Sequence, residues 1–177
     1  MQLPTSNSVF QNAWVVDDVE AAAMNWVNTF GIGPFFLAEY GPGQLVDITY
    51  RGRPAELNML VAIAQAGPVQ IELVQPLGDT PNPYRDTVAV GENKFHHVCV
   101  WSHDLDADLE YYRSLGCDIA TTGQVKGSSR FAYVDSHPQL SCMLELLEHN
   151  AMFEKVFKMI ADTCADWDGE RPIRGYD

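Results

Sequence analysis

Two adjacent histidines, His96 and His97, stand at the start of the run HHVCVW, which has the composition of a β-strand. An imidazole at such a place can bind a metal, act as a general base, or remain a polar group at the edge of a sheet. Because successive side chains of a strand point to opposite faces, we expect His96 to point away from His97. His96 would then be a surface residue or a residue that orients a ligand by a hydrogen bond.

A glutamate lies among apolar residues in each of two further strand-like runs, Glu72 in VQIELVQP and Glu145 in CMLELLE. By alternation, Glu72 shares its face of the strand with Gln70 and Val74. A carboxylate in apolar surroundings is costly unless something positive pairs with it. Each glutamate taken alone is best explained as an edge residue that reaches water or an arginine.

An internal repeat relates these residues to one another. The strand NAWVV is followed by a helical pattern that Asp18 can cap, and HVCVW is followed by one that Asp104 can cap, each pattern ending at a glycine. Gln11 and His97 are as far apart as the two aspartates (97 − 11 = 104 − 18 = 86). Gln11 therefore takes the place in the first copy that His97 takes in the second.

The repeat places Gln11, Glu72, His97 and Glu145 at symmetric positions. Their three oxygens and one imidazole nitrogen suit a divalent cation such as Zn, Ni, Co, Mn or Fe, with room for water or substrate. The alternative for His97, a lone core histidine, would not account for its three partners.

Three more strands follow each helix: PFFLAEY, a stretch within residues 45–65 and VQIELVQP, then DIATTG, RFAYVDS and CMLELLE. We therefore expect an α+β fold of two tandem βαβββ modules that form a cupped mixed sheet around a cleft, plus a C-terminal helix. The boundaries are residues 1–75 for the first module, 76–93 for a linker rich in Pro, Gly, Asp and Asn, 94–148 for the second module, and 149–177 for the helix and tail. The helix has apolar residues at helical spacing and is expected to pack on the outside.

The composition limits the partners. Lys and Arg total 11 against 24 Asp and Glu, and the formal charge of −13 disfavours nucleic acid and anionic membranes. The four cysteines form no CxxC pair, the N-terminus has no signal-peptide pattern, and the apolar runs are too short to cross a bilayer. We expect a soluble, cytoplasmic protein that acts on a small molecule, and a homodimer is plausible.

The ordered recurrence of strand, Asp-capped helix and glycine, with HHVCV, IELVQP and MLELLE, resembles the vicinal oxygen chelate superfamily over residues 9–148. That superfamily includes glyoxalase I, methylmalonyl-CoA epimerase, extradiol dioxygenases, and fosfomycin and bleomycin resistance proteins. The resemblance implies a metal held by His97, Glu72, Glu145 and Gln11. Many members have histidine at the place of Gln11, and eukaryotic-type glyoxalase I has glutamine there.

The set of Gln, Glu, His and Glu resembles that of glyoxalase and epimerase members. It implies a metal-dependent isomerase or lyase that acts on a small, partly apolar carbonyl substrate through a metal-bound enediolate or enolate, with Glu145 or Glu72 as the catalytic base. Two alternatives stay open: a metal-free protein that binds small molecules such as drugs, and an extradiol-type ring-cleaving dioxygenase. The dioxygenase uses two His and one carboxylate, whereas this set has one His. A purely structural role ranks below all of these.

Contacts to the substrate are assigned to Arg130 and Tyr133 in SSRFAYVD. Glutathione and CoA are anionic and need basic residues, of which this chain has few near the expected cleft: Arg51, Arg53, Arg85, Lys126 and Arg130. The aromatic content favours an apolar substrate instead.

Overall fold

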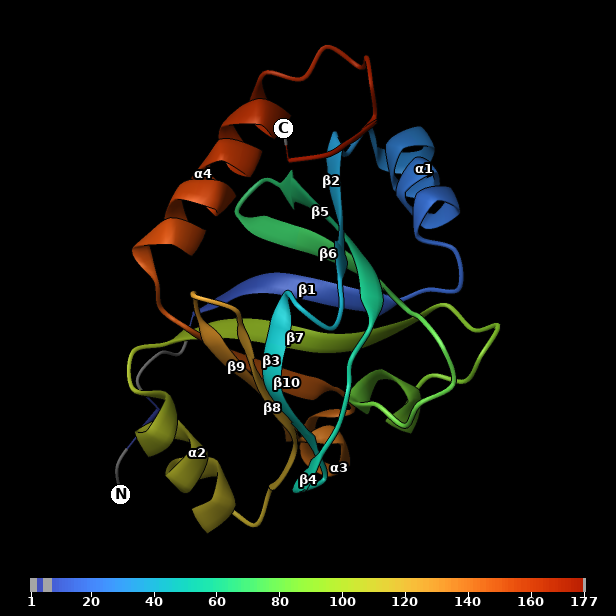
Figure 1. Cartoon of the computed structure of the whole chain (residues 1–177). Helices are drawn as coiled ribbons and strands as arrows, with labels where there is room; N and C mark the ends of the chain where they lie inside the picture. Colours follow the sequence, from blue (N-terminus) through green and yellow to red (C-terminus); the bar gives the residue numbers. More distant parts are fainter. Residues whose placement is uncertain (1–2, 5–7, 177) are drawn as a thin grey trace.

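The two halves of the chain are built from the same series of elements (Figure 1). The computed structural model describes residues 3–4 and 8–176. The sequence predicts no signal peptide at the N-terminus, and part of that stretch lies outside the described residues. The first half contains β1 (Val9–Val15), α1 (Val19–Phe30), β2 (Phe35–Tyr40), β5 (Met59–Ala66) and β6 (Val69–Pro76). The second contains β7 (Lys94–Ser102), α2 (Leu105–Ser114), β8 (Asp118–Val125), β9 (Arg130–Asp135), the short α3 (His137–Leu140) and β10 (Met143–Glu148).

The strands β1 and β7 pair antiparallel in the middle of the sheet. Each has the last strand of its own half as a parallel neighbour, β6 beside β1 and β10 beside β7. Gln11 lies opposite Cys99, and Ala13 lies opposite His97. Adding 86 to the residue number carries Gln11 to His97 and Ala13 to Cys99, so the repeat maps each of these pairs onto the other. A dyad therefore relates the halves between β1 and β7, and the predicted fold of two βαβββ repeats is confirmed.

A hairpin of β3 (Leu45–Tyr50) and β4 (Arg53–Pro54) departs from the repeat. It follows β2 in the chain but pairs with β8 of the second half, with Leu45 opposite Val125. At the other edge, β11 (Ile173–Arg174) pairs with β2. In the described part of the chain, the 11 strands of the sheet thus have the order β11-β2-β5-β6-β1-β7-β10-β9-β8-β3-β4. The sequence predicts a strand within residues 45–65, but a strand's own alternation does not specify which neighbour it joins.

The helices α1 and α2 begin at the predicted caps. The side chain of Asp18 accepts a hydrogen bond from the backbone N–H of Ala21 at 2.9 Å, and that of Asp104 accepts one from Ala107 at 3.1 Å. α1 packs on β5 and β6, and α2 packs on β8, β9 and β10. Among the described residues, no helix combines the length and the apolar character needed to cross a membrane.

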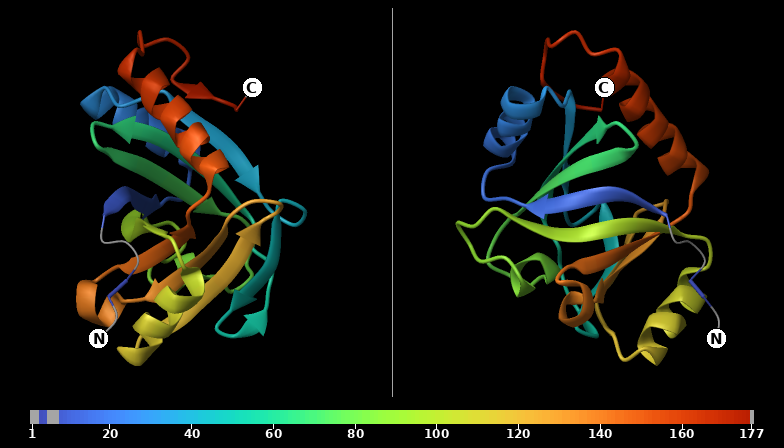
Figure 2. Two further views of the ribbon diagram at one scale, coloured as in Figure 1. Left: turned by 90° about the vertical axis from the view of Figure 1, so that its left-hand side faces the viewer. Right: turned by 180° about the vertical axis from the view of Figure 1, so that it is seen from behind.

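The C-terminal helix α4 (Ala151–Ala165) lies on the opposite face of the first-half strands from α1, as the views of Figure 2 show. Phe153 and Phe157 of α4 pack with the cluster of Met59 and Val61 from β5, whereas Ala62 of that strand faces α1. The sequence predicts that this helix packs on the outside by its apolar stripe, and Ile160 is fully buried whereas Met152 is exposed. It does not indicate which face of the sheet the helix covers. Apolar residues occupy both faces of β5, so each face needs a cover, and α4 covers the concave one.

The two capping aspartates provide a test of the repeat. Asp18→Ala and Asp104→Ala should each lower the free energy of unfolding by about 1 kcal/mol, because each leaves backbone N–H groups of a first helical turn without an acceptor. Urea denaturation followed by circular dichroism measures this loss. Asp18→Asn and Asp104→Asn keep the acceptor and should stay close to the unmodified protein. Equal losses for Asn and Ala would show that the charge, and not the cap, stabilises these helices.

Candidate metal centre

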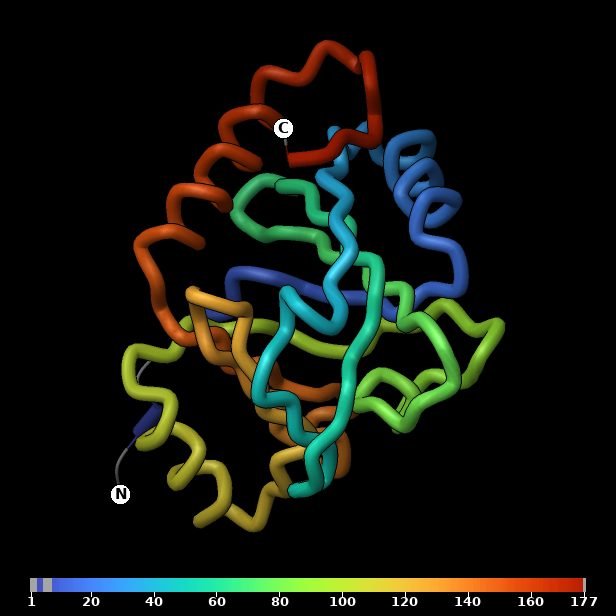
Figure 3. The backbone as a smooth tube through the Cα atoms, viewed as in Figure 1, coloured from blue at the N-terminus to red at the C-terminus, as the bar shows by residue number. Residues whose placement is uncertain are grey.

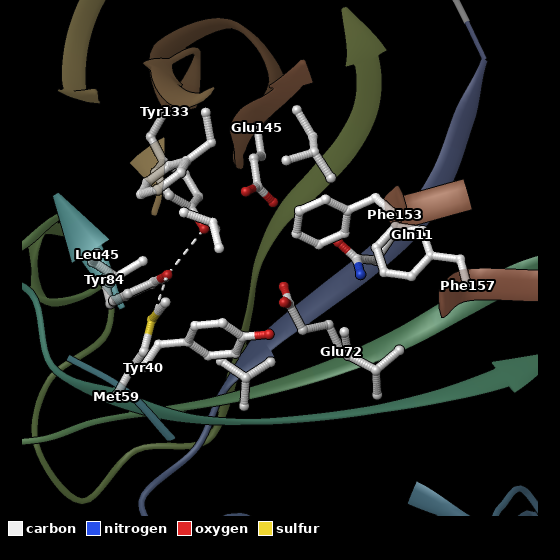
Figure 4. A pocket seen from close by; sticks show the side chains of 15 residues that line it. Gln11, Tyr40, Leu45, Met59, Glu72, Tyr84, Tyr133, Glu145, Phe153 and Phe157 are labelled. Carbon is white, nitrogen blue, oxygen red and sulfur yellow. Dashed lines mark hydrogen bonds between the residues drawn. The ribbon is translucent and has the colours of Figure 1, made fainter. Parts of the chain in front are cut away.

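The four predicted ligand residues project from four neighbouring strands. Glu72 of β6 lies beside Ala13 of β1, and Glu145 of β10 lies beside Cys99 of β7, so the dyad brings the two glutamates to the same place. His97 Nε2 lies 3.1 Å from an oxygen of Glu72 and 3.2 Å from an oxygen of Glu145. Figure 4 shows both carboxylates pointing into one pocket, with the Gln11 amide beside them.

Charge and burial act together at this cluster. His97 is fully buried, and Glu72 and Glu145 are each 9% exposed. Burial alone would lower the pKa of His97, but the hydrogen bonds and charges of Glu145 and Glu72 outweigh it and raise the pKa to about 9. Burial, helped by the charge of Glu145, raises the pKa of Glu72 above its usual range against the opposing effect of His97. The His97 imidazolium is therefore the positive partner of two buried carboxylates.

Gln11 is oriented by a second glutamine. Its Nε2 donates to Oε1 of Gln70 at 3.1 Å, and both side chains are 3% exposed. Gln70 is the register partner of Gln11 across β1 and β6. With the amide nitrogen engaged in this bond, the amide oxygen is the atom of Gln11 that a cation would bind.

The residues fit a divalent cation. One atom each of Glu72, His97 and Glu145 lie within 4.8 Å of one another. Ligands held at about 2.0–2.2 Å from one ion lie roughly 3–4 Å apart. No lysine or arginine lines the pocket among the residues that the structure describes, so a cation bound here would supply charge that those side chains do not.

His96 does not point away from His97, so this expectation was wrong. The register steps from Ala13 opposite His97 to Trp14 opposite Phe95, which leaves His96 as the extra residue of a β-bulge. The bulge interrupts the alternation and turns both imidazoles to one side. Nδ1 of His96 lies 2.9 Å from Nδ1 of His97, with the two rings nearly perpendicular at 89°.

The partners of His96 determine the tautomer of His97. Nε2 of His96 lies 3.1 Å from the carbonyl oxygen of Pro83, which can only accept, so this nitrogen carries the proton. Burial and the neighbouring charge of His97 lower the pKa of His96 to about 3, which keeps the ring neutral and its Nδ1 an acceptor. His97 must then donate from Nδ1. Its Nε2, on the side of the glutamates, becomes the nitrogen whose lone pair can bind a metal.

Tyr84 is a pocket residue that the sequence did not indicate. It comes from the short helix η1 (Pro83–Asp86) in the predicted linker and is 1% exposed. Its hydroxyl donates to the sulfur of Met59 at 3.1 Å and lies 2.9 Å from the hydroxyl of Tyr133, the predicted substrate contact (Figure 4). The polar composition of residues 76–93 predicts an exposed linker, and no periodicity marks a buried tyrosine within it.

An ion-pair network fixes the turn that carries Tyr84. The guanidinium of Arg51 lies 2.7 Å from a carboxylate oxygen of Asp86 and 2.7 Å from one of Asp135. The hydroxyl of Tyr50 also donates to Asp86, at 2.5 Å. The β3–β4 hairpin of the first half thereby holds the linker turn against β9 of the second half. The same turn supplies the Pro83 carbonyl that orients His96.

Arg130, the other predicted substrate contact, is not brought to this pocket. Its guanidinium pairs with Glu148 at 2.7 Å and with Asp106 at 3.1 Å. It lines a separate hollow beside Leu105 and Leu109 of α2. Tyr133 and Gln11 line the pocket together with Glu72 and Glu145.

Removal of the His96 acceptor should weaken metal binding. His96→Phe leaves the His97 Nδ1–H without a partner and frees the ring to rotate, so we expect the affinity for Co²⁺ or Ni²⁺ to fall about 10- to 100-fold in calorimetric titration. His96→Gln can both accept and donate and should recover part of the loss. The control is His103→Phe, a histidine outside the cluster. An unchanged affinity in folded His96→Phe would contradict the proposed role.

Metal binding should release a proton. His97, with a pKa of about 9, is protonated at neutral pH, and an ion that binds its Nε2 must displace that proton. The affinity should therefore rise about tenfold per pH unit between pH 6 and 8.5. Calorimetry at pH 7.5 in buffers of different ionisation enthalpy should count about one proton released per ion. Binding that releases no proton and does not depend on pH would place the ion elsewhere.

Comparisons with known proteins agree with this architecture. The family model described as the glyoxalase/bleomycin resistance protein/dioxygenase superfamily matches residues 10–133. No curated protein sequence matches the chain.

Solved structures with the same fold are distant in sequence. A hypothetical protein from Bacillus halodurans has 14% identity and a TM-score of 0.61, over 82% of this chain and 96% of its own. A methylmalonyl-CoA epimerase from Mycobacterium tuberculosis has 17% identity and a TM-score of 0.52, and the match covers 87% of this chain and 97% of the epimerase. A Streptomyces coelicolor methylmalonyl-CoA epimerase in complex with 2-nitronate-propionyl-CoA has 18% identity and a TM-score of 0.55, and the match covers 81% of this chain and 94% of that epimerase. With the family model matching most of its length, the chain belongs to the glyoxalase/bleomycin resistance protein/dioxygenase superfamily, the vicinal oxygen chelate proteins that its repeat resembles.

Proposed function

We propose that the protein is a metal-dependent isomerase or lyase of the glyoxalase and epimerase type. It would move a proton at the carbon next to a carbonyl group of a small, partly apolar substrate. The observation that carries this proposal is the pair of buried glutamates, Glu72 and Glu145, that face one pocket on either side of His97. The epimerases among the structural neighbours are consistent with it.

The ligands of the metal would be Gln11, Glu72, His97 and Glu145, and the ion one of Zn, Ni, Co, Mn or Fe in the divalent state. When bound, the ion supplies a positive charge that stabilises negative charge on the oxygens of the substrate. The hydrogen bond that Gln11 donates to Gln70 and the one between the two histidines hold Gln11 and His97 in orientation. These contacts reduce the reorganisation needed at the moment of reaction.

One of the glutamates would act as the general base. Glu72 and Glu145 occupy equivalent places, so they can approach a bound substrate from two sides. Burial raises the pKa of Glu72, and a carboxylate with a raised pKa is a stronger base when it is ionised. The proton would move from the substrate carbon to a carboxylate oxygen. Its return to the opposite face of the same carbon would give epimerisation, and its delivery to the adjacent carbon of an enediolate would give isomerisation.

A second candidate function is a metal-free protein that binds a small molecule. The pocket lining favours it, because apart from Gln11, the two glutamates and the tyrosines every described lining residue is apolar. Ring cleavage of the extradiol type fits the geometry less well. A second histidine ligand would be needed, and both nitrogens of His96 face other partners, Nδ1 of His97 and the Pro83 carbonyl.

Substitution of the glutamates tests the enzymatic proposal. Glu72→Gln and Glu145→Gln each keep the shape of the side chain but remove its ability to accept a proton. The variant at the glutamate that acts as the base should exchange the substrate C–H proton with D2O at least 100-fold more slowly. The measurement is deuterium incorporation, by NMR or mass spectrometry, into a panel of hydroxy-ketones and acyl thioesters. Glu148→Gln is the matched control, since Glu148 is on the same strand as Glu145 but pairs with Arg130.

Elemental analysis decides between the two candidate functions. Protein purified without added metal should carry an ion or bind one stoichiometrically on titration, and Glu145→Ala should lose it. If the unmodified protein binds no ion on titration and exchanges no substrate proton, the enzymatic proposal fails and the metal-free binding protein replaces it.

A further inference from the structure

We infer that α4 makes this site selective for an uncharged substrate whose apolar group, an aryl or branched alkyl chain, packs on Phe153 and Phe157. Acyl-CoA thioesters and glutathione conjugates would be excluded. This inference rests on the proposed function, because it names the class of substrate for the same pocket.

The charged side chains that line the pocket have one sign, and the His97 imidazolium beside them is already paired with Glu72 and Glu145. Glu72 and Glu145 are acidic, and no lysine or arginine is among the described residues that line it. The remainder of the lining is aromatic, aliphatic or phenolic. The phenols of Tyr40, Tyr84 and Tyr133 already lie in the field of the glutamates, whose charges raise the pKa of each beyond the effect of burial. An anionic substituent packed on the apolar wall would meet no lysine or arginine among the described lining residues, and burying such a charge unpaired is costly.

Of the five basic side chains expected near the cleft, Arg51, Arg85 and Arg130 are engaged elsewhere. Arg51 bridges Asp86 and Asp135, and Arg130 bridges Glu148 and Asp106. The guanidinium of Arg85 donates to the backbone carbonyls of Val88 and Ala89. A carrier could recruit one of these groups only by breaking its present contacts.

The wall formed by α4 is fixed along its length. Asn150 caps its first turn, and Phe157 packs against Phe10 and Trp101 with ring centroids 5.7 Å apart in both cases. Ile160 in the middle of the helix is fully buried. Near its end, Cys164 accepts a hydrogen bond from the backbone of Gln65.

The chain beyond α4 is anchored as well. β11 pairs with β2, and the ring of Tyr176 lies 5.5 Å from that of Phe36. Phe153 and Phe157 are therefore presented to the pocket by a braced element, which is what a selective wall requires (Figure 3 traces this segment in red).

This wall is outside the part of the chain that the superfamily pattern describes. The family model ends at residue 133, before α4 begins at Ala151. From beyond the matched residues, α4 supplies Phe153 and Phe157 to the apolar side of the site.

The test uses three ligands that share one chelating group. Benzohydroxamate carries an aryl group, acetohydroxamate a methyl group, and 4-carboxybenzohydroxamate an aryl group with an added negative charge. On the full chain loaded with Co²⁺ or Ni²⁺, calorimetry should find benzohydroxamate at least tenfold tighter than acetohydroxamate and at least tenfold tighter than the carboxylated compound. Acetyl-CoA should not compete.

Variants of α4 attribute the preference to the wall. Phe153→Ala should weaken benzohydroxamate about tenfold and leave acetohydroxamate unchanged. Met152→Ala, on the same helix but 51% exposed, is the matched control and should change neither affinity. Phe153→Lys adds the missing cation and should reverse the order of benzohydroxamate and its carboxylated analogue. This variant keeps the test decisive if Phe153→Ala is poorly folded.

The inference is overturned if the three hydroxamates bind equally, if acetyl-CoA competes at similar concentration, or if Phe153→Ala and Met152→Ala behave alike. A titration without metal separates it from the proposed function. If the protein binds no ion but still binds benzyl alcohol, with an affinity that Phe153→Ala lowers and Met152→Ala does not, the proposed function fails and the selectivity of the wall is supported. If the ion binds and exchange occurs without a preference for the aryl group, the selectivity fails and the proposed function holds.

Discussion

Two buried carboxylates share one histidine at the centre of the sheet, and the rest of the structure is constrained by that concentration of negative charge. Glu72 and Glu145 are each 9% exposed, and His97 between them is fully buried. An ionised carboxylate that leaves water costs several kcal/mol unless an opposite charge compensates it. In the structure the His97 imidazolium provides that compensation, and its pKa rises to about 9 as the consequence. A divalent cation would compensate both carboxylates more completely, and the cluster of Glu72, His97 and Glu145 could hold one.

The symmetric and the asymmetric parts of the chain have different roles around this cluster. The dyad between β1 and β7 brings the predicted ligand residues together, because residues at equivalent positions of the two halves meet on the axis. The parts that break the symmetry orient them. The bulge at His96 turns its ring toward His97, the linker turn supplies the Pro83 carbonyl, and the crossing hairpin holds that turn through Arg51 and Asp86. Each of these supports acts on the second-half side of the site. Gln70 is the corresponding support on the first-half side.

The C-terminal helix adds a third kind of asymmetry. It closes the concave side of the first-half strands and presents Phe153 and Phe157 to the same pocket that the glutamates enter. The site therefore has a polar floor with the candidate ligands on the central strands and an apolar wall on α4 and β5. A substrate with oxygens at one end and an apolar group at the other matches this division. In such a pocket the chelating residues would determine the chemistry, and the wall would determine which molecules undergo it.

The sequence by itself determined the repeat, the capped helices, the fold class and the residues that meet at the cluster. These follow from local alternation and capping, from the spacing of 86 positions that relates Gln11 to His97, and from the equivalent last strands that carry Glu72 and Glu145, all of which are properties of neighbouring residues or of duplication. Only the tertiary structure decided that His96 faces His97, that Tyr84 of the linker is buried in the pocket, that the β3–β4 hairpin joins the other half, that α4 covers the concave face, and that Arg130 pairs with Glu148 and Asp106. Each of these depends on a bulge, an ion pair or a packing contact between residues distant in the chain, and no period in the sequence encodes such contacts.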